Sequence, residues 1–418
     1  MTTFSMEAMA ANSKVASRVA AQLTTVEKNN LLNQMADAIE ASADTIITEN
    51  KKDIDAGEAK GLTSAMLDRL LLTPERVKDI SDAIREIATL TDPVGDISNL
   101  SLRPNGMQVG KMRIPLGVIA MIYEARPNVT AEAAALCIKS GNAVILRGGS
   151  EAIHSNLALA QCLHQVLEQQ NIDKNIVGVI PDTSRGVIEQ LLKQRETIDL
   201  VIPRGGEGLI RYVTENSQIP VIQHFKGVCH LFIDKAADLN KAVDILINGK
   251  TQRPSACNSI ETLLVHQEIA EQFLPLAAKA LADAAQVKVH ACAQSLPYFE
   301  QAEPASEEDY HAEYLAQEIA VKVVASFDDA VSHINEYTSD HTEVIVSQDT
   351  SRTQQFIRQI NSSVVMVNAS SRFSDGGQLG LGSEIGISTS KLHAYGPMGL
   401  ASLTTEKFVV YGDGQVRA

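Results

Sequence analysis

Residues 117–146 read GVIAMIYEARPNVTAEAAALCIKSGNAVIL, and this stretch decides the fold class. The apolar run 118–122 predicts a short buried strand, residues 129–140 predict a helix, and 143–146 predict a second strand. The alternation continues along the chain and ends in a short strand expected at 221–223. Strand–helix–strand alternation of this kind is typical of a parallel sheet with helices on both faces.

A second alternating series begins near residue 225 and predicts a second α/β domain. It comprises apolar, strand-like runs at 231–233 and 261–265, with a helix-like segment at 239–249 between them. Further strands and helices are expected between 320 and 367. The intervening segment 293–309 is polar and contains proline, which indicates a surface loop.

The first 90 residues predict helices, and two later segments predict a small β-arm. Thr24 to Glu27 form a capping-box pattern, and Thr73 precedes a proline at a first helical position. Residues 97–102 and 107–114 flank a Pro-Asn-Gly turn, which indicates a hairpin. The β-prone residues 408–411 predict a closing strand near the C-terminus.

The composition describes an ordinary globular protein of two or three domains. The 418 residues are 44% hydrophobic and 21% charged, and they contain no Trp. The net charge of -15 argues against nucleic acid or an anionic membrane surface as a partner. An anionic substrate must therefore be bound by local arginines, lysines or helix N-termini.

The cysteine pattern and the N-terminus indicate a cytoplasmic protein. The five cysteines contain no CxxC pair, which predicts no disulfide framework and a reducing compartment. The first residues lack the basic and apolar regions of a secretory signal, and no apolar run is long enough to span a membrane.

Cys257 lies at a junction between predicted elements, where a thiol can reach a substrate. Pro254 ends the preceding helix and biases Arg253 toward extended geometry, and an apolar strand starts at Ile260. A thiolate is a strong nucleophile toward carbonyl carbon. A free cysteine is also among the most buried residue types, so this position alone favours catalysis only modestly.

Two glycine-rich turns follow strands of the first sheet, and each carries an arginine. A strand end that opens a helix can bind phosphate through backbone N–H groups, although neither turn matches GxGxxG. Ligand-free tight turns account for most such glycines. The residues are Arg147, Gly148, Gly149 and Ser150 in one turn, and Arg204, Gly205 and Gly206 in the other.

No metal site is expected from the spacing of ligand residues. His333 and His341 are separated by a predicted helix end, and no Cys or carboxylate spacing supports zinc. His333 is interpreted as structural. A late glycine cluster at 375–383 suits either a flexible loop or backbone that approaches a substrate.

The run AVSHINEYTSDHTEVI at 330–345 resembles the signature of the γ-glutamyl phosphate reductases, which are glutamate-5-semialdehyde dehydrogenases of the aldehyde dehydrogenase superfamily. The sequence departs from the family at Thr338, usually Gly or Ser, and at Tyr395, more often Arg. The other similar segments are 113–118 (RIPLGV), 123–129 (YEARPNV), 252–259 (QRPSACNS), 368–377 (NASSRFSDGG) and 388–394 (STSKLHA).

The resemblance covers essentially the whole chain and implies an aldehyde-dehydrogenase-like fold without a fused kinase domain. A Rossmann-type nicotinamide-binding domain is implied for residues 1–96 and 115–224. A catalytic domain with Cys257 is implied for 225–385. A β-arm for oligomerisation is implied for 97–114 and 401–418.

The implied activity is NADPH-dependent reduction of L-glutamyl 5-phosphate to L-glutamate 5-semialdehyde and inorganic phosphate, in proline biosynthesis. Cys257 would attack the acyl phosphate and form a thioester. Arg253 suits the leaving phosphate, though a surface salt bridge is an equal alternative. The candidates for oxyanion or substrate binding are Arg126, Asn128, Arg253, Ser370 and Asp375.

Hydrolytic aldehyde dehydrogenases carry a Glu-Leu-Gly-Gly-Lys run whose Glu activates water. The corresponding stretch here, 223–228, reads QHFKGV and has no carboxylate, which favours acyl-phosphate chemistry; His224 is a less favoured alternative base. A hydrolytic or CoA-acylating aldehyde dehydrogenase stays open, as does a catalytically silent homologue.

Arg147 and Ser150 favour NADP(H) over NAD, because a 2′-phosphate suits them. A homo-oligomer is implied, and association with a separate glutamate 5-kinase is plausible because acyl phosphates are labile.

Overall fold

The computed structural model describes residues 4–417, which divide into two compact units. Within the described residues, unit 1 comprises 4–223, Leu381–Gly386 and 398–417, and unit 2 comprises His224–Gly380 and Ile387–Pro397. A two-stranded sheet is formed by β14 (Gly386–Ser388) and β15 (Gly396–Met398). The functional roles assigned to the domains from the sequence stay predictions.

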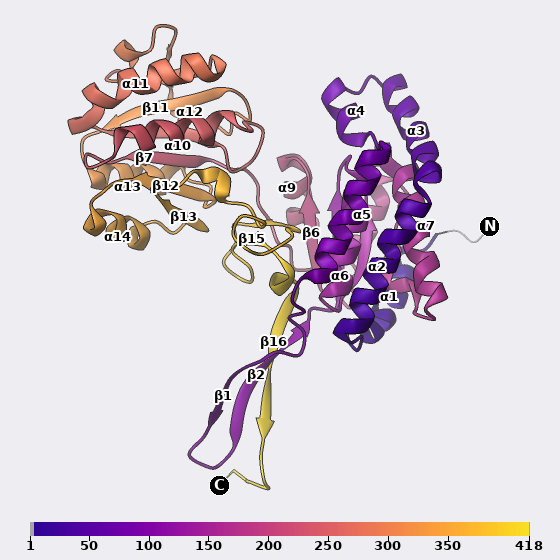
Figure 1. Ribbon diagram of the computed structural model, residues 1–418. Coiled ribbons are helices and arrows are strands. Elements are labelled where there is room, and N and C mark those ends of the chain that lie inside the picture. The colour runs from indigo at the N-terminus through magenta and orange to yellow at the C-terminus, as the bar shows by residue number, and fades with distance from the viewer. Residues whose placement is uncertain (1–3, 418) are drawn as a thin grey trace. The chain divides into compact units, whose positions relative to one another are not determined.

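Unit 1 contains a parallel sheet with strand order β5-β4-β3-β6 (Figure 1). Every residue of β3 is buried, as expected for a strand covered on both faces. The sheet predicted from residues 117–146 is therefore confirmed. Its strands are β3 (Val118–Tyr123), β4 (Ala143–Arg147), β5 (Val177–Val179) and β6 (Leu200–Arg204).

Alternate strand residues of unit 1 face different helices. Val118 and Ile145 belong to a core with Val187 of α8 and Val213 of α9, whereas α6 and α7 contact the sheet outside that core.

The predicted capping box at Thr24 is present, and Thr73 caps the helix that begins at Pro74. The helices of unit 1 are α1 (Met6–Ala20), α2 (Thr25–Ala41), α3 (Ala43–Ala59), α4 (Ser64–Leu70), α5 (Pro74–Thr89), α6 (Pro127–Lys139), α7 (Ile153–Gln169), α8 (Arg185–Leu192) and α9 (Glu207–Asn216), with short 3-10 turns η1 (Ser150–Ala152), η2 (Lys174–Ile176) and η5 (Leu400–Leu403).

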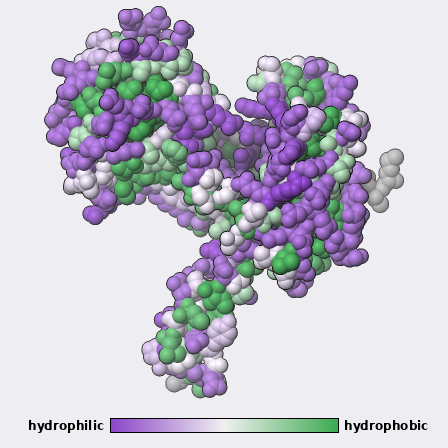
Figure 2. Space-filling model, in the orientation of Figure 1, coloured by the Kyte–Doolittle hydropathy of each residue, from purple (hydrophilic) through white to green (hydrophobic). Residues whose placement is uncertain are grey.

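The β-arm of unit 1 consists of β1 (Ile97–Leu102), β2 (Gln108–Pro115) and β16 (Thr404–Tyr411). Both β1 and β16 pair antiparallel with β2, so the predicted hairpin and closing strand are confirmed. The arm extends away from the parallel sheet of unit 1, and Figure 2 shows apolar side chains on its surface. Its exposed apolar residues are Ile97, Leu100, Leu102, Phe408, Val410 and Tyr411.

Unit 2 contains a parallel sheet with strand order β10-β9-β11-β8-β7-β12-β13 (Figure 1). All residues of β7 and β8 are buried, because both faces of the sheet are covered. The strands are β7 (Cys229–Ile233), β8 (Ile260–His266), β9 (Lys288–Ala291), β10 (Glu303–Pro304), β11 (Glu318–Val324), β12 (Thr342–Val346) and β13 (Val364–Val367).

Two hydrophobic cores cover the faces of this second sheet. Leu231 and Leu263 pack with α10 and α11, whereas Phe232 and Leu264 pack with α13 and α14. Among the described residues, no helix combines the length and apolarity needed to cross a membrane. The helices of unit 2 are α10 (Leu239–Thr251), α11 (Gln267–Ala285), α12 (Glu307–His311), α13 (Phe327–Tyr337) and α14 (Thr350–Gln359), with short turns η3 (Leu296–Tyr298) and η4 (Ser371–Phe373).

Two local predictions from the sequence are wrong. Residues 221–223 form a single bridge, between Val221 and Val201, since such a short run supplies too few ladder bonds to continue. Residues 293–309, expected to be a loop, contain η3 and β10 and begin α12. Glu303 there pairs with His290 of β9, a sheet position that a polar sequence does not reveal.

His333 on α13 is a buried structural histidine. Lys322 Nζ lies 3.1 Å from its Nδ1, and its Nε2 has no hydrogen-bond partner among the described residues. Burial, followed by neighbouring His230 and Lys322, lowers the pKa of His333 to about 2. The ring is therefore neutral in the folded chain at pH values where an unfolded histidine, with a pKa of about 6.5, takes up a proton.

We expect His333 to make the free energy of unfolding fall by about 2 kcal/mol between pH 7 and pH 5, because only the unfolded chain binds the additional proton in that window. Urea titrations across this range should show a correspondingly shallower decline for His333→Gln. Lys322→Met is the matched control: it removes the charge but not the burial, so most of the decline should remain. If the free energy of unfolding of His333→Gln fell as steeply as that of the wild-type chain, this assignment would be contradicted.

Candidate active site

Cys257 lies on the turn between the end of α10 and the start of β8, as the sequence predicts. The backbone N–H of Ala256 donates to the carbonyl of Arg253 at 3.1 Å, and that of Ser259 donates to Ala256 at 2.9 Å. The side chain of Cys257 is half-buried, and it forms no disulfide. A half-buried thiol on a tight turn has the partial exposure that a nucleophile needs.

The turn is held by contacts from two other segments, one at η4 and one at the start of β7. Ser371 Oγ donates to the Asn258 carbonyl at 2.6 Å, and Asn258 Nδ2 donates to the Ser374 carbonyl at 2.8 Å. The Cys229 thiol donates to the carbonyl of Cys257 at 3.3 Å. The thiol is therefore presented by a backbone whose polar groups are bonded to buried neighbours.

Gly227 lies against the backbone of Cys257. A Cβ at Gly227 would lie 2.0 Å from the Cys257 carbonyl oxygen and 3.0 Å from Cys257 Cα. The Gly227 N–H donates to Glu313 Oε1 at 2.8 Å, which fixes this segment in turn. Only glycine permits such an approach of two backbones.

Beneath the turn, Lys250 at the end of α10 pairs with Glu261 at the start of β8. Their Nζ and Oε2 atoms are 2.6 Å apart, and both side chains are fully buried. Burial raises the pKa of Glu261 to about 7 and lowers that of Lys250, while the pairing opposes both shifts. The pair joins the two elements that flank Cys257.

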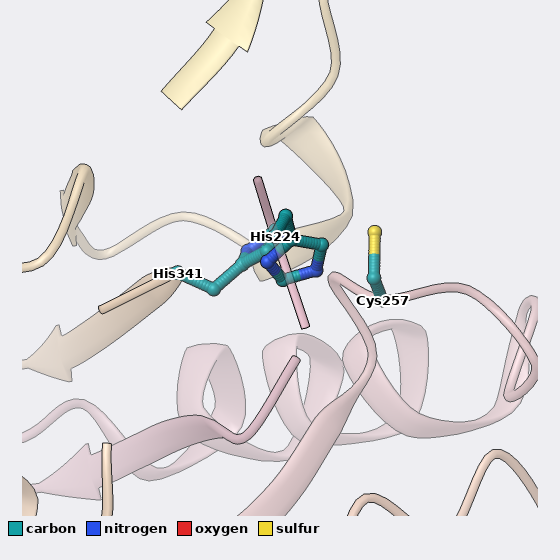
Figure 3. Close-up of side chains that lie close together, drawn as sticks. All are labelled: His224, Cys257 and His341. Carbon is teal, nitrogen blue, oxygen red and sulfur yellow. The ribbon is translucent and has the colours of Figure 1, made fainter. Parts of the chain in front are cut away.

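Two histidines lie beside the thiol. Figure 3 shows the imidazoles of His224 and His341 close together, with the side chain of Cys257 next to them. The ring centroids are 4.8 Å apart, and one nitrogen from each ring lies within 4.8 Å of the other and of Cys257 Sγ. Burial lowers the pKa of His224 to about 4 and also that of His341, so both rings are neutral at pH 7.

The hydrogen bonds of His341 define its tautomer. Its Nδ1 lies 2.8 Å from Thr342 Oγ1, and the Thr342 hydroxyl donates to Ser374 Oγ. The Thr342 oxygen must therefore accept the Nδ1–H of His341, which leaves the lone pair on Nε2. That Nε2 is buried and has no hydrogen-bond partner within residues 4–417.

Arginines form the electropositive side of the site. Arg372 Nε donates to Gln252 Oε1 at 2.8 Å, and Arg372 interacts electrostatically with Cys257 and Arg253. Burial, followed by the charge of Arg253, lowers the pKa of the Arg372 guanidinium. The exposed Arg253 predicted from sequence and the half-buried Arg372 thus belong to the surroundings of the thiol.

Ser370 and Asp375, also expected from the sequence, form turns around Arg372. The Ser370 hydroxyl oxygen accepts the Arg372 backbone N–H at 3.3 Å. Asp375 Oδ1 accepts from Gly377 and Gln378 N–H at 3.0 and 3.3 Å. Both side chains therefore shape the segment that carries Arg372, and their binding of substrate stays a prediction.

Arg126 and Asn128 belong to unit 1. Arg126 is exposed at the N-cap of α6, and Asn128 Nδ2 donates to Glu132 Oε1 at 2.9 Å. Burial raises the pKa of Glu132. The proposed roles of Arg126 and Asn128 toward the thioester stay predictions.

The turn Arg147–Ser150 leads from β4 into η1. Arg147 Nη2 donates to the Thr183 carbonyl at 2.9 Å, and its buried Nε has no partner among the described residues. Burial lowers the pKa of Arg147, while Glu151 and Asp182 oppose that shift. A Cβ at Gly148 would lie 2.1 Å from Asn156 Nδ2, and one at Gly149 would lie 2.1 Å from Glu151 Oε1.

The turn Arg204–Gly206 leads from β6 into α9. Arg204 Nη1 donates to the Ile385 carbonyl at 2.9 Å. The Gly206 N–H donates to Glu124 Oε2 at 3.1 Å, and a Cβ at Gly205 would lie 2.7 Å from Glu124 Cδ. The backbone N–H that the sequence suggested for phosphate binding thus donates to a carboxylate instead. The cofactor role of this turn stays a prediction.

Sequence reasoning missed Arg372, considered His341 only as a metal ligand and set it aside, and assigned His224 little weight. His341 precedes β12 and is brought to Cys257 by the pairing of β12 with β7 and of β7 with β8. Its 84-residue separation from Cys257 carries no motif signal. Arg372 lay within the matching segment 368–377, so its position between Ser370 and Asp375 was the available signal.

The chain is similar to known proteins over its whole length. Residues 2–295 match the model of the aldehyde dehydrogenase family. The chain is 77% identical over 417 residues to a γ-glutamyl phosphate reductase of Colwellia psychrerythraea, covering 100% of both chains. A second such reductase, from Idiomarina loihiensis, is 60% identical over 96% of each chain. The solved γ-glutamyl phosphate reductase of Thermotoga maritima superposes with a TM-score of 0.97 at 40% identity, covering 99% of this chain and 100% of that one.

We expect Gly227→Ala to slow alkylation of Cys257 by iodoacetamide, since the added methyl would lie 2.0 Å from the Cys257 carbonyl oxygen and must displace that backbone by about 1.4 Å to reach ordinary contact. Peptide mapping by mass spectrometry reports the rate at each cysteine. Gly186→Ala in α8 is the matched control, because its added Cβ would have no described atom within 4 Å beyond its chain neighbours and the adjacent backbone of its own helix. Labelling of the buried Cys137 would reveal unfolding, and an unchanged Cys257 rate in a folded variant would contradict the contact.

Proposed function

The chain belongs to the γ-glutamyl phosphate reductases of the aldehyde dehydrogenase family, and from this membership we propose that it reduces L-glutamyl 5-phosphate to L-glutamate 5-semialdehyde and phosphate in proline biosynthesis. The observation that supports this chemistry most directly is the half-buried thiol of Cys257 beside two neutral imidazoles and two arginines. These groups supply a nucleophile, a proton acceptor and an anion-binding region.

In the first step the Cys257 sulfur attacks the acyl carbon and phosphate leaves, which gives a thioester. His224 is the proposed acceptor of the thiol proton, because its neutral ring carries a lone pair at pH 7. The protonated imidazole would form an ion pair with the developing thiolate, and this attraction offsets the desolvation cost that burial places on the charged ring. Arg253 and Arg372 are proposed to bind the leaving phosphate through charge-assisted hydrogen bonds.

Family membership implies a nicotinamide cofactor, and the turn after β4 fits an anionic group of such a molecule. Arg147 supplies a buried Nε without a described partner, and Ser150 supplies a hydroxyl at the start of η1. The residues proposed to hold the cofactor are Arg147, Gly148, Gly149, Ser150, Arg204, Gly205 and Gly206. When bound, the cofactor supplies a hydride to the thioester carbon.

The chain's own groups then stabilise the negative charge on the former carbonyl oxygen. We propose the Cys257 backbone N–H and the Asn128 amide as donors to this oxygen. Collapse of the thiohemiacetal releases the aldehyde and returns the sulfur as a thiolate, which regains its proton from His224. Arg126, Ser370 and Asp375 are proposed to recognise the remainder of the substrate.

The β-arm is proposed to mediate homo-oligomerisation. Its outer strands β1 and β16 are the edges of their sheet and carry exposed apolar side chains, features that favour association with another chain. A cytoplasmic location and association with a glutamate 5-kinase are also proposed, the latter because an acyl phosphate hydrolyses readily in water.

The decisive experiment follows NADPH formation from glutamate 5-semialdehyde and NADP⁺ with and without inorganic phosphate. We expect strict dependence on phosphate, because phosphate is the acyl acceptor, and a loss on the order of 10³-fold or more in Cys257→Ser. Turnover without phosphate would instead identify a hydrolytic aldehyde dehydrogenase, with His224 activating water. CoA in place of phosphate tests the CoA-acylating alternative. Absence of turnover with every acceptor would support a catalytically silent homologue.

The preference for NADPH is proposed to depend on Arg147. Loss of a charge-assisted hydrogen bond costs about 1.5–3 kcal/mol, so Arg147→Ala should lower kcat/KM for NADPH about tenfold or more relative to NADH. Steady-state kinetics with both coenzymes measures this ratio. Arg195→Ala, which removes an exposed arginine of the same unit, is the matched control. An unchanged ratio in Arg147→Ala would assign coenzyme selection to other residues.

A further inference from the structure

The side chains of His224, His341 and Cys257 form a cluster with the composition of a metal site. One nitrogen of each imidazole and the sulfur all lie within 4.8 Å of one another (Figure 3). The three residues come from separate segments: one before β7, one before β12 and one on the turn before β8. Their linear spacing gave no metal motif, whereas the folded chain brings their ligand atoms together.

His341 is oriented as a ligand. Its Nδ1–H is held by Thr342, whose own hydroxyl donates to Ser374, so the lone pair lies on Nε2. Histidines that bind metals characteristically donate the opposite ring N–H to such a partner, which fixes tautomer and orientation. The Cys229 thiol does not compete for Nε2, since its sulfur approaches Nδ1 and its hydrogen is donated to the Cys257 carbonyl.

Both histidines carry a buried nitrogen whose bonding capacity is unused. His341 Nε2 and His224 Nδ1 are buried and have no hydrogen-bond partner among the described residues, and His341 is 0% exposed. An unsatisfied buried polar atom costs about 1–3 kcal/mol. An unpartnered lone pair in a fully buried ring beside a thiol is an independent indication that a ligand belongs here.

We propose that Cys257, His224 and His341 bind one borderline-soft divalent cation, of which Zn²⁺ is the type. Sulfur and imidazole ligands suit Zn²⁺, whereas Mg²⁺ and Ca²⁺ prefer oxygen. Zn–N and Zn–S bonds of about 2.0–2.1 and 2.3 Å place tetrahedral ligand atoms about 3.4–3.6 Å apart. The three ligand atoms are spread over up to 4.8 Å, so binding requires these side chains to rotate toward a common centre, and water completes the fourth position.

Binding exchanges a proton for the metal without any redox change. The S–H bond of Cys257 breaks, a sulfur–zinc bond forms, and one proton is released to solvent. The sulfur lone pair needed for attack on the acyl carbon is then engaged. The site therefore acts as a reversible metal switch on the nucleophile. Metal binding is independent of the proposed function, but the expected inhibition rests on it.

The test uses the metal-free full-length chain under anaerobic conditions, titrated with Co²⁺ as a spectroscopic substitute for Zn²⁺. We expect saturation at one equivalent, with near-ultraviolet thiolate-to-cobalt absorption and visible bands typical of four-coordinate cobalt. Zn²⁺ should abolish these bands and protect Cys257 from iodoacetamide, whereas Mg²⁺ should do neither. Absence of the charge-transfer absorption in the wild-type chain would overturn the proposal.

Variants assign the ligands. Cys257→Ser should lose the charge-transfer absorption, and His224→Ala and His341→Ala should each weaken Zn²⁺ binding at least about tenfold, the minimum cost of losing even a supporting group. Cys292→Ser, which removes the other half-buried thiol, is the matched control and should retain wild-type binding. Circular dichroism identifies any unfolded variant. If replacement of the fully buried His341 unfolds the chain, His224→Ala alone tests the histidine ligands. Wild-type affinity in Cys257→Ser would overturn the site.

Activity is measured separately on the same samples. Inhibition by Zn²⁺ that EDTA reverses, with the midpoint shifted upward in the folded histidine variant, supports the switch. Phosphate-dependent turnover without any cobalt–thiolate absorption would overturn the metal site and leave the proposed function intact. Cobalt–thiolate absorption in a chain without turnover would support the metal site and overturn the proposed function.

Discussion

The close approach of Gly227 to the carbonyl of Cys257 is the constraint on which the site depends. Because a Cβ would lie 2.0 Å from that oxygen, the two backbones are in direct contact. His224 lies three residues before Gly227, and β7 begins two residues after it. One short segment therefore fixes the imidazole, the carbonyl of Cys257 and the entry into β7. A shift in this contact moves all three together.

Buried charges strengthen the frame around this contact. Lys250 and Glu261 join α10 to β8 beneath the turn, and Glu343 of β12 accepts from both the backbone and the ring of His230 on β7. A buried ion pair adds little net stability, because desolvation offsets most of its attraction, but loss of one partner leaves an isolated buried charge. We interpret these pairs as constraints that specify how neighbouring elements join, which is what a positioned thiol needs.

Local sequence signals predicted the fold and the position of Cys257 on a turn, but not the residues that surround it. Pro254 and the apolar run from Ile260 placed Cys257 on a turn because each acts on its own neighbours. The hairpin followed likewise from Asn105 and Gly106. His341 reaches Cys257 only through strand order, which no local pattern encodes. Glu124 at the Gly206 N–H is similarly a tertiary contact between strand ends.

In the part of the chain that the structure describes, the ligand-type groups clustered with this thiol are two imidazoles rather than carboxylates. A carboxylate near Cys257 would be ionised, would repel an acyl phosphate and would draw water to the thioester. In the proposed reaction, a neutral imidazole would accept a proton without placing negative charge next to the incoming phosphate, and burial keeps the rings neutral. The same neutrality leaves two nitrogen lone pairs beside a sulfur, which is a ligand set for a soft cation. The arrangement inferred to favour transfer of the acyl group to phosphate is therefore also the one inferred to make this thiol sensitive to metal, because both inferences depend on uncharged nitrogen in place of charged oxygen.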